Sequence, residues 1–358
     1  MPAEASLKAW LALSLTRGLG GENARRLLRE FGSPDAVFTA SNHSLRSIVK
    51  PDVAAEIGNG IADSAVGPAL DWLNDDSNHV VTLADNDYPQ ALLNIPDPPL
   101  LLYVKGRLDL LNRSALAVVG SRSATPQGIN NAEAFAKSLS DAGLCIISGL
   151  AHGVDAAAHR GALRGRGSSA AIVGTGLNIV YPAANRELAH ALAQQGALVS
   201  EFPLGTPPLA ANFPRRNRLI SGMSLGCLVV EASLQSGSLI TARLALEQGR
   251  DVFAIPGSIH APQSKGCHAL LKQGAKLVET AQDILEELGG VIETSTPAPG
   301  SEGANPLLLE HLGFDPVDVD TLSLRSGLTI AELSAMLLAL ELSGHICALP
   351  GGLYQRIH

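Results

Sequence analysis

The sequence has few aromatic residues and few cysteines, and it contains no long apolar run. Aromatic residues make up 4% of the 358 residues, whereas hydrophobic residues as a whole make up 46%. Many small apolar side chains favour α/β layers, because helices can then approach a sheet closely. A chain of 358 residues also predicts two or three domains rather than one.

Signals for export and for membrane insertion are missing from the sequence. The N-terminus lacks a basic segment followed by an uninterrupted apolar run, so we expect no signal peptide. Apolar stretches such as GCLVV end well short of the ~18 residues that a membrane span needs. We therefore expect a soluble, cytoplasmic protein with no membrane partner.

The four cysteines are widely spaced and form no C-x-x-C pair; they are Cys145, Cys227, Cys267 and Cys347. Cys145 and Cys227 lie within apolar, strand-like runs, which favours buried free thiols. Free thiols agree with a cytoplasmic location.

The net charge of −8 argues at first against a polyanionic partner, but the charge is unevenly distributed. Residues 1–112 carry 9 basic and 14 acidic side chains, residues 113–280 carry 15 and 9, and residues 281–358 carry 2 and 11. A basic middle between two acidic ends is typical of a polyanion-binding surface. Ordinary statistical scatter is the alternative explanation.

Residues 1–75 are predicted to form a small domain of short helices. In LSLTRGLGGENARRLLREFG, a turn at Gly18 to Gly21 separates an apolar helix from an amphipathic one. The arrangement resembles a helix-hairpin-helix or SAM-like domain, whose turn can offer backbone N–H groups to a phosphate. Arg25, Arg26 and Arg29 lie nearby, and a plain helical packing module is an equal alternative.

Residues 80–290 are predicted to form an extended Rossmann-like domain of class α/β. Short apolar runs alternate here with helical patterns; they are LAVVG, LCIISG, AAIVGTG, ALVSEFP, CLVVEA, DVFAIPG and AKLVET. Continuous apolar runs are typical of strands that are buried on both faces of a parallel sheet. Right-handed crossovers then bring the loops after these strands to one rim of the sheet.

Residues 293–306 are small, polar and proline-containing, which predicts a linker. Residues 307–358 then suggest three helices and a closing hairpin, the composition of a winged-helix-like domain. Its last expected helix, residues 329–343, contains neither Lys nor Arg. A DNA-reading helix needs basic or amide side chains, so we interpret this domain as a protein-docking module.

Common enzyme motifs are absent, so we expect no catalytic residues and no cofactor. The sequence has neither a P-loop nor a G-x-S-x-G elbow, and in GTGLNI an isoleucine replaces the third glycine of a dinucleotide fingerprint. His152, Asp155 and His159 have the spacing of possible metal ligands. Such a lone set more often caps and packs a helix, so we predict no metal.

Several loops of the predicted rim are rich in glycine, small hydroxyl groups and arginine. Backbone N–H groups of glycine turns, arginine forks and one aromatic face together suit a single strand of nucleic acid. The candidate residues for binding single-stranded DNA are Gly120, Ser121, Arg122, Gly149, Gly153, Gly174, Gly176, Phe213, Arg215, Arg216, Asn217, Arg218, Ser236, Gly237, Arg243 and Lys265. Each loop alone is a weak indication of DNA binding. The prediction depends on the expected convergence of all these loops on one rim of the sheet.

Seven segments of the chain, in order over residues 80–280, resemble the motifs of the DNA-processing protein A family (DprA, also called Smf). They are GSRSATPQG, SGLAHGVDAAAH, GTGLNIVYPAAN, SEFPLG, FPRRNRLISG, VVEASLQSGSLITARLALEQGR and AIPGSIHAPQSKGCHALLKQGA. The resemblance implies a homodimer that protects incoming single-stranded DNA during natural transformation and helps to load RecA. It also implies a DNA pocket around Arg122 and the F-P-x-R-N-R motif that begins at Phe213. Ala183 and Ala184 stand where several relatives carry a basic residue, so the phosphate contact there is either weakened or supplied by Arg215 or Arg186 instead.

An enzyme on the same fold is the main alternative, namely a nucleotide phosphoribohydrolase or a related nucleotide hydrolase. Such an enzyme needs a carboxylate for general acid–base work, and the AIPGSIHAP segment lacks one where the P-G-G-x-G-T-x-x-E loop would lie. Glu201 and Glu231 end strands and could serve, but each could equally hydrogen-bond rim amides and fix the loops. A purely structural interaction protein would leave the basic rim unexplained.

Overall fold

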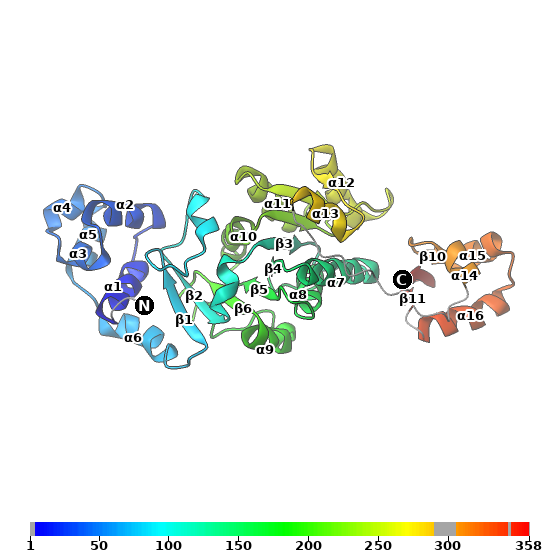
Figure 1. Cartoon of the computed structure of the whole chain (residues 1–358), viewed down its shortest axis with the longest axis horizontal. Helices are drawn as coiled ribbons and strands as arrows, with labels where there is room; N and C mark the ends of the chain where they lie inside the picture. The colour runs from blue at the N-terminus through cyan, green and yellow to red at the C-terminus, as the bar shows by residue number, and fades with distance from the viewer. Residues whose placement is uncertain (1–3, 290–305, 343–344, 358) are drawn as a thin grey trace.

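The computed structural model describes residues 4–289, 306–342 and 345–357. Six helices come first, as expected: α1 (Glu4–Leu15), α2 (Gly21–Phe31), α3 (Pro34–Thr39), α4 (Asn42–Arg46), α5 (Pro51–Gly58) and α6 (Asp63–Trp72). Gly18 makes the turn between α1 and α2 with a φ of +78°, a backbone conformation that favours glycine. Ala24 and Leu27 on α2 are buried, as the helical spacing predicts. These helices lie beside the β1 end of the central sheet (Figure 1).

The central sheet has nine strands in the order β1-β2-β6-β5-β4-β3-β7-β8-β9. The strands are β1 (Asn78–Thr82), β2 (Leu101–Gly106), β3 (Ala115–Val119), β4 (Cys145–Ser148), β5 (Ser169–Ile172), β6 (Ala197–Ser200), β7 (Gly226–Val229), β8 (Asp251–Ala254) and β9 (Lys276–Leu277). Strands β3 to β9 are parallel and match the seven predicted runs. The antiparallel strands β1 and β2 extend this sheet at the β6 edge.

Helices cover both faces of the sheet. They are α7 (Pro126–Asp141), α8 (Val154–Ala162), α9 (Arg186–Gln195), α10 (Asn212–Gly222), α11 (Ser238–Glu247), α12 (Lys265–Lys272) and α13 (Ala281–Glu287), with short 3-10 turns η1 (Gln90–Asn94), η2 (Leu108–Asn112), η3 (Ala183–Asn185) and η4 (Pro262–Ser264). Alternate residues of β3 enter opposite cores: Ala117 and Val119 pack with α10, α11 and α12, whereas Leu116 and Val118 pack with α7 and α8. The expected doubly wound α/β fold is confirmed.

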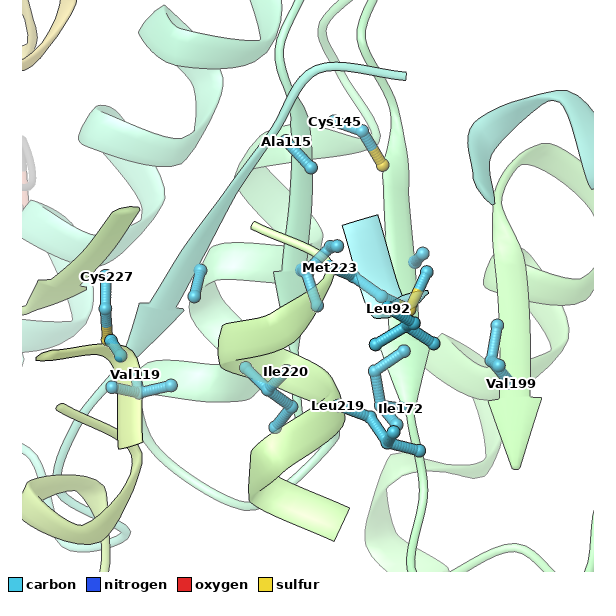
Figure 2. Close-up of a cluster of buried hydrophobic side chains, with 14 of the residues drawn as sticks. Leu92, Ala115, Val119, Cys145, Ile172, Val199, Leu219, Ile220, Met223 and Cys227 are labelled. Atoms are coloured by element: carbon cyan, nitrogen blue, oxygen red, sulfur yellow. The ribbon is translucent and has the colours of Figure 1, made fainter. Parts of the chain in front are cut away.

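Helix α10 is anchored to the sheet by its second half. Leu219, Ile220 and Met223 are buried in the same core cluster as Val119 and Ile172 (Figure 2). This apolar anchor leaves the first turns of α10, with Phe213 and its arginines, at the rim of the sheet. Cys145 and Cys227 are buried free thiols, as expected, and Cys267 is buried as well.

The order of the strands creates a switch point between β3 and β7. From β3 the chain winds outward through β4, β5 and β6, and it then crosses over to continue through β7, β8 and β9. The loops that leave β3 and β7 therefore diverge at the carboxyl edge. In open α/β sheets this crevice is where ligands bind.

The C-terminal part forms a separate winged-helix domain. It contains α14 (Pro306–Leu312), β10 (Val317–Asp318), α15 (Val319–Ser326), α16 (Ile330–Leu342), β11 (Ile346–Leu349) and β12 (Leu353–Arg356). The closing hairpin β11–β12 was expected, and it pairs with a short strand, β10, in a three-stranded sheet that was not. The predicted linker, apart from Pro306, lies outside the described residues. Among the described helices, none is long and apolar enough to cross a membrane.

Candidate functional site

A pocket of about 660 Å³ opens at the switch point, at the carboxyl ends of β3 and β7. Its wall combines the loop after β3, the first turns of α10 and the segment that leads from β7 into α11. Half of the predicted site residues line it: Gly120, Ser121, Arg122, Phe213, Arg216, Asn217, Ser236 and Gly237. The pocket thus joins segments that lie more than a hundred residues apart.

The open surface of the pocket consists of Arg122, Tyr181, Phe213 and Ser236, all of which line it. The Arg122 side chain is exposed, and its guanidinium lies 5.9 Å from the centroid of the Phe213 ring. Tyr181 lies on the other flank, with its ring centroid 5.5 Å from that of Phe213. A cation and two aromatic rings therefore face one space.

Arg216 lies below this surface and is only 4% exposed. Its Nη1 donates to the carbonyl oxygen of Gly149 at 2.7 Å and to that of Ile172, and its Nε donates to Asn217 at 3.2 Å. Burial lowers the pKa of Arg216 to about 10, an effect that the carboxylate of Asp155 opposes, so the group stays charged at neutral pH. Arg216 thereby holds the ends of β4 and β5 together.

Asp155 and Glu231 also act by fixing loops. Asp155 accepts hydrogen bonds from the backbone amides of Gly149 and Ala151 at 3.2 and 3.3 Å. Burial raises the pKa of Asp155, and Arg216 with these amides opposes the rise. Glu231 accepts from the Thr125 amide at 2.9 Å and from its hydroxyl at 2.6 Å. The prediction that a strand-ending glutamate fixes a rim loop is therefore confirmed for Glu231.

His159 is buried inside the domain, where its contact is with a serine. Its Nδ1 lies 2.7 Å from the hydroxyl of Ser169, and burial lowers its pKa to about 3. In the described part of the chain, no group of three or more His, Cys, Asp or Glu side chains could hold a metal ion. Asp155, His159, Arg216 and Glu231 together form what we call the supporting layer of the pocket.

Of the three candidate arginines in this segment, Arg216 lines the pocket, whereas Arg215 and Arg218 do not. Arg218 pairs with Glu201 and lies 3.6 Å from Asp97, which in turn accepts from Arg25 of α2 at 2.7 Å. Arg215 is 63% exposed and lies 3.7 Å from the same Glu201. The segment that begins at Phe213 is a helix and not a loop, so Arg215 and Arg218, one turn apart, share a face that Arg216 does not.

Glu201 differs from Glu231 in what it binds. Its side chain is 5% exposed, and burial raises its pKa while Arg218 and Arg215 oppose that rise. It is paired with guanidinium groups and not with the rim amides that the sequence suggested as one possibility. Arg25 is likewise occupied, since it also donates to the carbonyl oxygen of Pro98 at 2.8 Å.

The remaining predicted residues lie outside the pocket lining. Lys265 donates to the carbonyl oxygen of Ile259, and Arg243 is exposed on α11. The predicted glycines permit close approach of neighbouring groups: a Cβ on Gly153 would lie 2.2 Å from the carbonyl oxygen of Ser121, and one on Gly174 would lie 3.0 Å from the Phe213 ring. Gly149 and Gly176 are equally crowded, by Arg216 and by Pro203.

The pocket is also lined by Tyr181, Asp155 and Thr241, none of which is among the predicted binding residues. Tyr181 lies in the GTGLNIVYPAAN segment that resembles a family motif, and the spacing of Asp155 indicated only a possible metal ligand. Thr241 follows Ser238 by three residues on α11, and that spacing on a helix start could have indicated it.

A doubly wound sheet with a pocket at its switch point places the chain among Rossmann-like α/β folds. Within that class, the chain belongs to the DNA recombination-mediator protein A family, whose family model matches residues 79–289. The model of the DprA winged helix domain matches residues 293–352. The family suggested by the sequence motifs is therefore confirmed.

Relatives agree with this assignment over most of the chain. Protein Smf of Escherichia coli is 46% identical over 304 residues, which are 82% of this chain and 81% of that protein. The X-ray structure of DNA processing protein A from Streptococcus pneumoniae superposes with a TM-score of 0.70 at 38% identity, covering 78% of this chain and 97% of that one. A structure from Helicobacter pylori, described for its single-stranded DNA binding mode, has a TM-score of 0.54 at 31% identity and covers 59% and 95%.

Proposed function

We propose that this protein binds single-stranded DNA at the switch-point pocket and acts as a recombination mediator without turnover. The observation that carries the proposal is the joint exposure of Arg122 and two aromatic rings in one pocket. Cations that follow phosphates and rings that stack bases are the usual means of holding a single strand. The binding mode named for the Helicobacter pylori relative supports the same ligand class.

The proposed contacts divide by accessibility. Arg122, Ser121, Ser236 and the backbone of Gly120 and Gly237 would hold phosphates, and Phe213 and Asn217 would meet a base or sugar. Arg215 is exposed beside the pocket and could extend the path of the strand. The shape of the pocket would depend on Arg216 and on the four crowded glycines Gly149, Gly153, Gly174 and Gly176. Arg218, Arg243 and Lys265 lie outside the pocket lining and are given no contact with the strand.

Family membership supports the finer parts of the proposal. We expect a cytoplasmic homodimer that protects incoming DNA during natural transformation and helps to load RecA. A hydrolase on the same fold is the less favoured function, because Glu231 already accepts two hydrogen bonds from Thr125 and Glu201 is paired with two arginines. Both carboxylates thus make structural contacts, which disfavours a role in general acid–base work.

A gel shift with single- and double-stranded oligonucleotides, run beside a nucleotide-hydrolysis assay, tests the proposal. We expect a preference for the single strand and no hydrolysis. If about four phosphates are neutralised, the logarithm of the binding constant should fall with the logarithm of salt at a slope of about −3. Equal affinity for duplex, a flat salt dependence or nucleotide turnover would contradict it.

A further inference from the structure

Tyr181 is an aromatic side chain that the fold leaves exposed at the pocket. It is 45% exposed, whereas Tyr88 and Tyr103 are fully buried. An exposed ring that lines a concave, partly cationic pocket retains apolar area which a ligand can cover.

The loop that carries Tyr181 is held in place on both sides of the ring. Before it, the Thr175 hydroxyl donates to the carbonyl oxygen of Ile179 at 2.9 Å. After it, the buried Asn185 amide donates to the carbonyl oxygens of Leu150 and Ala151 at 2.9 and 3.2 Å. A ring that is fixed before the ligand arrives loses little conformational entropy on binding.

Phe213 has less free surface than Tyr181. Its ring packs so closely over Gly174 that a Cβ there would lie 3.0 Å away, and the Arg122 guanidinium occupies another side. Phe213 is half-buried. The neighbouring Tyr181, 5.5 Å away, is therefore the more accessible of the two rings.

We propose that Tyr181 is a binding residue that stacks on a nucleobase of the single strand, as the more accessible member of the ring pair that it forms with Phe213. The inference rests on the proposed function and adds the recognition of bases to that of phosphates. Stacking requires only a π face, so the contact tolerates every base. Phosphate recognition by Arg122 and base recognition by Tyr181 are then separable.

The test compares oligo-dT with an abasic deoxyribose-phosphate oligomer of the same length. In the full-length protein, Tyr181→Ala should lower the affinity for oligo-dT about tenfold and leave the affinity for the abasic oligomer unchanged. Tyr181→Phe keeps the ring and should bind oligo-dT as the wild type does. Leu225→Ala, an exposed apolar residue at the opposite edge of the sheet, is the matched control and should change neither affinity.

A second readout uses Tyr181→Trp, whose fluorescence oligo-dT should quench and the abasic oligomer should not. An equal loss of affinity for both oligomers in Tyr181→Ala, or no loss for either, would overturn the stacking role. A wild type that bound neither oligomer would instead overturn the proposed function itself.

Discussion

The supporting layer and the open surface of the pocket use similar side chains for different purposes. Arg216 is buried and donates to the carbonyl oxygens of Gly149 and Ile172. Arg122 is exposed, and its guanidinium lies beside the Phe213 ring. The buried layer sets the shape of the pocket, and the exposed one supplies charge for a ligand. An arginine within a binding motif therefore need not be a ligand contact.

The strongest test of this division is Arg216→Ala. It removes three hydrogen bonds and the nearby positive charge that favours the ionised form of the buried Asp155, so we expect a loss of about 3–5 kcal/mol in the free energy of unfolding. Urea unfolding measures the loss, and the loss of DNA binding should follow it. If the variant were as stable as the wild type and still failed to bind DNA, Arg216 would have to contact the DNA directly.

Arg218→Ala is expected to cost about 3 kcal/mol of the free energy of unfolding, because it leaves the nearly buried Glu201 with only the exposed Arg215 at 3.7 Å. The double variant Arg218→Ala/Glu201→Gln should recover part of that loss, since the uncompensated carboxylate is gone. Both are measured by urea unfolding. Oligo-dT affinity that fell in the single variant at unchanged stability would mark Arg218 as a DNA contact.

The buried histidine of the supporting layer predicts an acid sensitivity. Because folding lowers the pKa of His159 from 6.5 to about 3, the unfolded chain binds more protons below pH 6.5, and stability falls as the pH falls toward 3. Between pH 7 and pH 5 this contributes a loss of about 2 kcal/mol. His159→Asn should lack that contribution in urea unfolding at the two pH values. The exposed His190→Gln is the control, and a His159→Asn variant with the wild-type pH dependence would refute the assignment.

The smallest expected effect concerns the open surface. Arg122→Ala should leave the free energy of unfolding within about 0.5 kcal/mol of the wild type, as is usual for an exposed side chain. It should weaken oligo-dT binding about tenfold and reduce the salt slope by about 0.7, the share of one phosphate. Titrations at several salt concentrations measure both. An unchanged slope would remove Arg122 from the phosphate path.

Most of the fold could be predicted because its signal is continuous burial. Seven apolar runs became the seven parallel strands, since strands covered on both faces cannot alternate in polarity. The antiparallel strands β1 and β2 were missed. The β2 run follows a proline-rich stretch, and no periodicity encodes the direction in which a strand joins a sheet.

The candidate site was predicted in part for the same reason. Loops that leave parallel strands must meet at one rim, which correctly brought Arg122 and Phe213 together. The roles of Arg216 and Arg218 could not be predicted, because three arginines within four residues do not reveal that the segment is helical. In the helix that it forms, each residue turns by about 100°, so neighbouring arginines face different surroundings.

The chain of alternating charges from Arg25 through Asp97 and Arg218 to Glu201 joins the N-terminal helices to the rim of the sheet. Dissolved ions screen partly buried pairs far less than they screen an exposed groove. A high-salt wash should therefore strip nucleic acid from the purified protein while its first two domains stay docked.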